Sequence, residues 1–179
     1  SLSATQLETF AKNFPMLVTD IHRASPTTNV CTTFQLEWMK GLRGGLFGGK
    51  NSAAQEQWSM LSKFQVADVV AFTTYPGLIY KNPSDLPDDY YAAIAEHTDR
   101  PVAFSELGWF RTGPAGWASS VTEQADFIHR FTSMTDPLDP QFTIWSFLYD
   151  QKTVEPFVTM GLLSDMMTDS PAWQAWSHP

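Results

Sequence analysis

The stretch Pro101-Val-Ala-Phe-Ser-Glu106-Leu-Gly-Trp109 contains the pattern that decides the fold. It begins with a short apolar run, which is typical of a buried strand in a parallel sheet. An acid, a glycine and an aromatic ring then follow, and they mark the end of that strand. We predict a strand over 101–106 with Glu106 at its carboxyl end.

The same unit recurs along the chain. The strand centres Phe34, Ala71, Phe104 and Ile144 lie 37, 33 and 40 residues apart. Each interval holds one helical pattern, which is the size of a βαβ unit and requires parallel strands. The other strands are predicted over 30–37, 68–74 and 142–148, and helices over 5–24, 52–64, 88–97, 121–134 and 171–176. The fold class is therefore α/β, with one domain over 1–179.

Length and composition exclude several classes of protein. The chain has 179 residues, fewer than the roughly 200–250 of a closed eight-stranded barrel. Its net charge of −8 and its lack of a basic cluster argue against a nucleic-acid partner. No apolar run approaches the roughly 18 residues that a membrane span needs. The lone Cys31 excludes an intrachain disulfide, and the histidines lack metal-ligand spacing. We predict no metal and no cofactor.

The carboxyl ends of the strands are where a parallel α/β sheet binds ligands. Glu106 is the most informative residue there, because a carboxylate at the rim of the core has a tunable pKa. The alternative is a structural role, in which Glu106 caps a neighbouring helix or pairs with Arg111. The other polar and aromatic residues at these ends are Gln35, Glu37, Trp38, Thr74, Tyr75, Pro76, Ser105, Trp109, Trp145, Tyr149 and Asp150.

The segment Ser-Glu106-Leu-Gly-Trp109 resembles the strand-seven nucleophile segment of the retaining (β/α)8 glycoside hydrolases, the clan of cellulases, β-mannanases and galactanases. Three more segments match strands five, six and eight in order: Thr-Phe-Gln35-Leu-Glu37-Trp38, Thr-Thr-Tyr75-Pro76 and Ile-Trp145-Ser-Phe. The resemblance implies the C-terminal half of a TIM barrel, with strands five to eight and a truncated N-terminus. It also implies that the parent protein hydrolyses a glycosidic bond in a polysaccharide or oligosaccharide with retention.

The resemblance assigns roles to individual residues. Glu106 matches the nucleophile, and Tyr75 matches the tyrosine that hydrogen-bonds it. Trp145 matches the aromatic floor of the cleavage subsite, and Trp38 and Trp109 are further candidates for stacking on sugar. The alternative for each tryptophan is packing in the core.

A retaining glycosidase needs a second carboxyl group as its general acid/base. In this clan that acid follows an Asn at the end of strand four, and the present sequence contains no Asn-Glu pair. Glu37 shares strand parity with Gln35, so both are expected to face the barrel interior. A hydrogen bond to substrate or a structural salt bridge is the expected role of Glu37. Because the acid is missing, this chain alone can be inactive.

Two other functions remain open. The first is a non-catalytic carbohydrate-binding or orphan barrel fragment that keeps the aromatic subsites. The second is nucleotide binding by the glycine-rich loop from Gly44 to Lys50, although Asn51 replaces the hydroxyl residue that a phosphate-binding loop needs. A half barrel would also expose two strand edges, so we expect a homodimer that pairs them.

Overall fold

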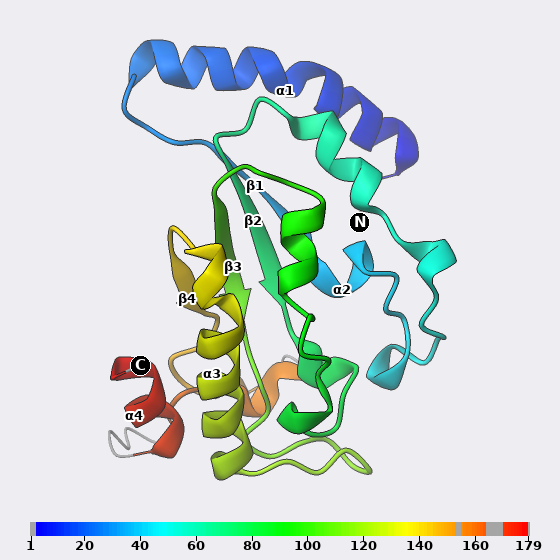
Figure 1. Cartoon of the computed structure of the whole chain (residues 1–179), viewed down its shortest axis with the longest axis vertical. Coiled ribbons are helices and arrows are strands. Elements are labelled where there is room, and N and C mark those ends of the chain that lie inside the picture. The colour runs from blue at the N-terminus through cyan, green and yellow to red at the C-terminus, as the bar shows by residue number, and fades with distance from the viewer. Residues whose placement is uncertain (1–2, 153–154, 164–169, 179) are drawn as a thin grey trace.

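The four strands of the computed structural model form one parallel sheet in the order β1-β2-β3-β4 (Figure 1). The structure describes residues 3–152, 155–163 and 170–178. Spatial order follows chain order, as expected of consecutive βα units. This confirms the predicted α/β class with a parallel sheet. The strands are β1 (Cys31–Gln35), β2 (Val69–Thr74), β3 (Val102–Leu107) and β4 (Thr143–Trp145).

The α-helices are α1 (Ala4–Ala24), α2 (Leu36–Met39), α3 (Val121–Thr135) and α4 (Pro171–Ser177). Helix α1 begins with a capping box at Ser3 and runs unbroken through Pro15. Phe14 and Val18 are anchored in the same apolar cluster, so packing holds the two sides of Pro15 in line. No helix in the described part of the chain is long and apolar enough to cross a membrane.

Two predicted helices have a different form. The segment 52–64 contains the 3-10 helices Ala53–Gln55 and Trp58–Phe64, and the segment 88–97 contains Ala92–Glu96. The amide of Gln57 donates to the carbonyl of Met39, so this backbone is tied to α2 where a continuous α-helix would bond to itself. The helices predicted over these two ranges are therefore present as short 3-10 helices and not as continuous elements.

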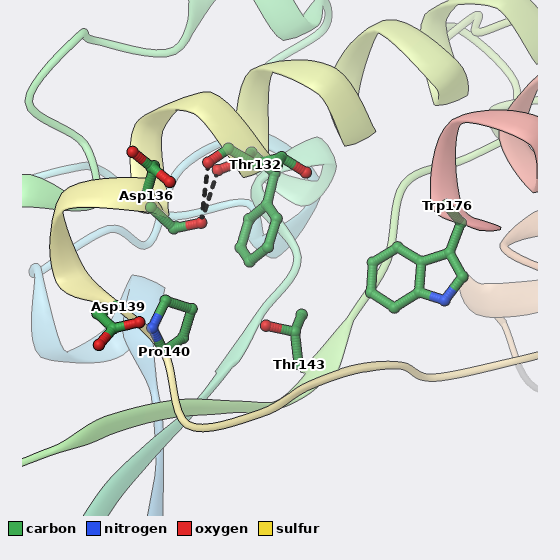
Figure 2. A pocket seen from close by; sticks show the side chains of 8 residues that line it. Thr132, Asp136, Asp139, Pro140, Thr143 and Trp176 are labelled. Atoms are coloured by element: carbon green, nitrogen blue, oxygen red, sulfur yellow. Dashed lines mark hydrogen bonds between the residues drawn. The ribbon is translucent and has the colours of Figure 1, made fainter. Parts of the chain in front are cut away.

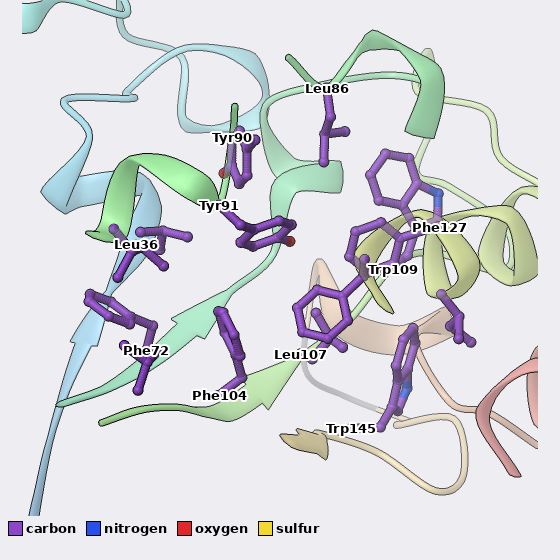
Figure 3. Packing of buried hydrophobic residues seen from close by; sticks show 14 of the residues in the cluster. Leu36, Phe72, Leu86, Tyr90, Tyr91, Phe104, Leu107, Trp109, Phe127 and Trp145 are labelled. Atoms are coloured by element: carbon purple, nitrogen blue, oxygen red, sulfur yellow. The ribbon is translucent and has the colours of Figure 1, made fainter. Parts of the chain in front are cut away.

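Helices cover one face of the sheet and enclose the main core. Phe72 of β2 and Phe104 of β3 point to the same side, where Tyr91 and Phe131 pack edge-on against Phe104 (Figure 3). All four rings are buried. This aromatic cluster joins the central strands to the segment before β3 and to α3. We call this side the helix face.

The opposite side, which we call the open face, carries small or exposed side chains. Ala71 and Ala103 lie on it with Thr33, which is exposed, and Ile144, which is 50% exposed. The face therefore presents a shallow floor beside the edge strands β1 and β4. It is the face that a closed barrel would turn inward.

A β-bulge in β3 decides which face receives Glu106. Phe72 pairs with Phe104, but the next residue of β2, Thr73, pairs with Glu106. Ser105 is the extra residue of the bulge. Strict alternation from Phe104 would turn Glu106 into the helix face. The bulge instead places Glu106 on the open face and returns Leu107 to the core.

Candidate functional site

The open-face ends of β2, β3 and β4 meet at a hydrogen-bonded triad. The Tyr75 hydroxyl donates to Oε2 of Glu106 at 2.7 Å and lies 2.7 Å from Oγ of Ser146. Oγ of Ser146 also accepts from the amide of Leu107 at 3.0 Å. The single phenolic proton goes to the carboxylate, so Ser146 donates to Tyr75. The chain of donors therefore runs from Ser146 through Tyr75 to Glu106.

The electrostatics keep Tyr75 a donor. Burial raises the pKa of the Tyr75 phenol well above its ordinary value, and the neighbouring Glu106 carboxylate raises it further. The phenol thus stays protonated at any ordinary pH. Glu106 is exposed, and within the described part of the chain its Oε1 accepts no hydrogen bond. Tyr75 thus holds one of the two carboxylate oxygens of an exposed side chain.

Ser146 is a site residue that the sequence reasoning missed. The segment Trp145-Ser146 was assigned through its tryptophan, whereas the hydroxyl next to it reaches Tyr75. Neighbouring residues at a strand end point to opposite faces. That alternation was the available signal, because either Trp145 or Ser146 had to face the site.

Glu37 lies under the triad and not on the open face. Strand β1 ends at Gln35, whose side chain caps α2 by accepting from the Trp38 amide at 2.8 Å. Glu37 is thus a residue of helix α2, and the prediction that it shares strand parity with Gln35 was wrong. Its side chain is completely buried. The cap at Gln35 ends the strand two residues earlier than predicted.

The Glu37 carboxylate is fully engaged by protein groups. Its Oε1 accepts from the Thr74 hydroxyl at 2.9 Å, the Tyr75 amide at 3.0 Å and the Tyr90 hydroxyl at 2.9 Å. Its Oε2 accepts from Nε2 of Gln35 at 2.5 Å. Burial raises the pKa of Glu37, although these hydrogen bonds oppose the shift. These contacts hold the end of β2 against α2.

The tryptophans differ in exposure. Trp109 is 1% exposed and stacks on Phe127. Trp145 is 7% exposed and donates from Nε1 to the carbonyl of Met160 at 2.8 Å. The structure places both in the helix-face core (Figure 3). Glu106 lies on the open face, on the other side of the sheet. Trp38 is 46% exposed, and the Arg43 guanidinium lies 3.8 Å from its ring. Of the three, Trp38 alone is half-exposed.

Arg111 does not neutralise Glu106. It forms an ion pair with Asp150, whose Oδ1 also accepts from the Gly161 amide. The alternative in which Glu106 pairs with Arg111 is therefore not the arrangement in the structure. Asp150 serves as the partner of Arg111 and is part of the loop scaffold behind the site.

The glycine-rich loop lacks the geometry of a phosphate cradle. Oδ1 of Asn51 accepts from the amides of Arg43 and Gly44, which are groups that a phosphate would need. A three-residue 3-10 helix, Ala53–Gln55, follows the loop where a phosphate-binding loop requires the start of an α-helix. Among the described residues, no cluster of three or more metal-ligating side chains occurs.

A separate hollow of about 290 Å³ lies at the amino end of β4, beneath the end of α3. Figure 2 shows Trp176 and Pro140 on opposite sides of it, with Thr143 between them. Glu106 stands at the carboxyl end of β3. The hollow therefore belongs to the opposite edge of the sheet and is not part of the triad.

No protein-family model matches the chain, and no curated protein matches it. Solved structures do. The first is an active-site mutant of the β-1,3-glucanosyltransferase of Rhizomucor miehei in complex with laminaritriose, at 12% identity and a TM-score of 0.56. The match covers 89% of this chain and 54% of that one.

Two structures of endo-β-1,4-mannanases from Thermotoga petrophila are also similar. The hyperthermostable enzyme with maltose and glycerol shares 14% identity at a TM-score of 0.56, over 94% of this chain and 50% of that one. The second shares 13% identity at a TM-score of 0.53, over 94% of this chain and 38% of that one. The chain thus spans about half the length of these enzymes or less. The likeness shows the fold, which is a glycoside hydrolase-like arrangement of parallel βα units.

Proposed function

We propose that this chain is the C-terminal half of a retaining (β/α)8 glycoside hydrolase barrel, and that Glu106 is its nucleophile. The observation that carries the proposal is the 2.7 Å hydrogen bond from Tyr75 to Glu106 at the open-face end of β3. The sequence resemblance assigned this partner to this carboxylate. The likeness of the fold to part of a glucanosyltransferase and of mannanases supports the same class. A carbohydrate is the proposed substrate.

The proposed chemistry uses both oxygens of Glu106. Its free Oε1 attacks the anomeric carbon while Tyr75 holds Oε2, so the carboxylate is oriented before the sugar arrives. The bond to the leaving oxygen breaks, and an ester between sugar and Glu106 forms. Water then attacks the anomeric carbon, gives one proton to the second carboxyl group acting as general base, and releases the Glu106 carboxylate.

Protonation of the leaving oxygen requires a second carboxylic acid about 5–5.5 Å from the nucleophile. Glu37 is buried and binds only protein groups, so it does not meet this need. We propose that the acid comes from the other half of the barrel. The isolated chain would then react only with sugars whose leaving group needs no proton.

An activated inhibitor tests the nucleophile without the acid. We expect dinitrophenyl 2-deoxy-2-fluoro-β-glucoside or -β-mannoside to form a stable ester on the chain, detected as one added sugar by intact mass spectrometry. Dinitrophenolate leaves unprotonated, so the reaction depends on the carboxylate alone. Peptide mapping should place the label on Glu106.

Glu106→Gln is the control, because it keeps the size of the side chain and removes the nucleophile. It should take up no label under the same conditions. A label on any other residue, or equal labelling of the variant, would remove Glu106 from the role. If the unaltered chain takes no label, the catalytic proposal fails for this chain.

The second candidate function is non-catalytic carbohydrate binding. The half-exposed ring of Trp38, with Arg43 on one side, favours it, since a flat ring and a cation suit the faces and hydroxyls of a sugar. Gln35 is adjacent but both ends of its amide bond to protein. Titration with β-glucan and β-mannan oligosaccharides, followed by tryptophan fluorescence of the chain and of Trp38→Ala, separates this function from catalysis.

We also propose that two copies associate through their sheet edges. β1 and β4 each have one unpaired side within the described sheet. Phe142 and Ile144, next to and within β4, are exposed apolar residues. Pairing β1 of one copy with β4 of the other would cover both edges.

A further inference from the structure

We propose that Glu37 is a positioning residue for the Glu106 carboxylate and that it acts through Tyr75. This inference rests on the proposed role of Glu106. Glu37 does not touch the open face itself, because its carboxylate is completely buried under the end of β2. Its influence passes through the backbone of the residue whose hydroxyl binds Glu106.

The backbone of Tyr75 leaves the sheet at this point. β2 ends at Thr74, and the 3-10 helix Pro76–Leu78 begins directly after Tyr75. The Tyr75 amide therefore needs a partner outside the strand ladder. Oε1 of Glu37 accepts from the Tyr75 amide at 3.0 Å, and it also accepts from the Thr74 hydroxyl at 2.9 Å. One carboxylate oxygen thus fixes two successive residues at the turn.

Glu37 is itself held from two directions. Gln35 donates to its Oε2 at 2.5 Å, and Tyr90 donates to its Oε1 at 2.9 Å. The ammonium of Lys40 lies 5.0 Å from the centre of the Tyr90 ring. Four donors and a nearby cation leave the buried carboxylate little freedom. The position of the Tyr75 backbone is therefore fixed before any ligand binds.

A displacement of the Tyr75 backbone would reach Glu106 directly. The phenol oxygen lies 2.7 Å from both Glu106 and Ser146, so a small shift at the amide would break this pair of hydrogen bonds. Misplacement of a reacting group by about 1 Å costs on the order of 100-fold in rate. A carboxylate without substrate contact can in this way set the geometry of the nucleophile.

The sequence offers a matched rescue variant. In Gln35→Glu/Glu37→Gln the donor and acceptor exchange places, so the amide at 37 donates to the carboxylate at 35. The new carboxylate can still accept from the Trp38 amide, as Gln35 does. The oxygen of the new amide still accepts from Tyr75, so the positioning contact survives while the charge moves.

The first test measures the maximal rate of labelling by the fluoroglycoside and its half-saturating concentration. We expect Glu37→Ala and Glu37→Asp to lower the rate about 10-fold or more with an unchanged half-saturating concentration. The double exchange should stay within about threefold of the original chain. Glu37→Ala/Tyr75→Phe should be no slower than Tyr75→Phe, because both act on one hydrogen bond.

Thr74→Val controls for lost stability, since it removes a donor to Glu37 and leaves the Tyr75 amide contact. When each variant is assayed the same number of degrees below its own unfolding temperature, Thr74→Val should be labelled faster than Glu37→Ala. Unchanged labelling in folded Glu37→Ala and Glu37→Asp would overturn the proposal. Full additivity with Tyr75→Phe would also overturn it.

A second measurement separates this proposal from the proposed function. The carboxyl carbon of Glu106, identified by its loss in Glu106→Gln, is observed by NMR in ¹³C-labelled protein. Glu37→Asp and Tyr75→Phe should shift it in the same direction, whether or not the chain reacts with a sugar. If the Glu106 signal shifts in these variants but the chain takes no label, Glu37 remains a positioning residue and the role of Glu106 as nucleophile is rejected. An unmoved Glu106 signal in Glu37→Asp rejects the positioning role.

Discussion

At the scale of single residues, the two glutamates of the site differ because of their surroundings. Glu106 stands exposed with one oxygen held by Tyr75. Glu37 is completely buried and accepts four hydrogen bonds. Desolvation destabilises the charged form of a buried carboxyl, so the pKa of Glu37 lies above its ordinary value of 4.5. The same side chain therefore serves as a structural anchor in one place and as a candidate nucleophile in the other.

This difference predicts a pH dependence of stability. Because the folded pKa of Glu37 is raised, its stabilising contribution is complete below about pH 4.5 and is lost as the pH rises through the folded value. Relative to Glu37→Gln, the free energy of unfolding of the original chain should fall over that rise, because the folded state holds the proton of Glu37 to a higher pH than the unfolded state does. Urea denaturation from pH 4 to 8 measures it. Glu56→Gln is the control, because Glu56 is exposed and forms no ion pair among the described residues. A constant difference between the original chain and Glu37→Gln would contradict the prediction.

At the scale of elements, α1 is joined to the sheet by a small cluster and one carboxylate. Phe14 and Val18 pack on Phe64. Oδ2 of Asp68 lies 2.9 Å from Nε2 of His22 and accepts from the Val30 amide at 2.7 Å. The Val30 amide and the neighbouring His22 lower the pKa of Asp68, so this anchor stays charged. Figure 1 shows α1 lying across the amino ends of β1 and β2. The helix is thus attached at the end of the sheet opposite the triad.

Two phenylalanines of α1, one turn apart, test this attachment. Phe14 is 4% exposed and Phe10 is 45% exposed, and their ring centres lie 5.8 Å apart. We expect Phe14→Ala to lower the free energy of unfolding by about 3–4 kcal/mol, because it leaves a cavity. Phe10→Ala should cost less than about 1 kcal/mol. Denaturant midpoints measure both. Equal losses would mean that another surface covers Phe10 in solution.

At the scale of the whole molecule, the described helices pack on one face of the sheet and enclose the main aromatic core. On the open face Thr33, Glu106 and Ile144 are exposed, and β1 and β4 each have one unpaired edge within the described sheet. Exposed apolar residues occur in and beside β4: Phe142 before it, Ile144 within it, and Leu148 and Tyr149 after it, where Tyr149 pairs with Leu163. Such edges favour pairing with a further strand. The proposed association of two copies follows from this asymmetry.

Light scattering coupled to size exclusion tests the association. We expect a mass of about twice 20.1 kDa. Ile144→Glu should convert the dimer to a monomer, because it places a charge on the β4 edge. Val121→Glu adds the same charge at the start of α3 on the helix layer and should leave the dimer intact. A monomeric mass for the original chain would reject the pairing.

Local sequence patterns alone determined the order of strands and helices, the parallel sheet, and the placement of Tyr75 and Glu106 at strand ends. Apolar runs and βαβ spacing are local properties that a single chain segment carries. The tertiary structure decided which side of the sheet each side chain faces and which side chains are buried. The bulge at Ser105 turned Glu106 to the open face, and the cap at Gln35 moved Glu37 out of its strand. It also placed Trp109 and Trp145 in the core. Strand register and burial depend on hydrogen bonds and contacts between distant segments, which periodicity within one segment does not encode.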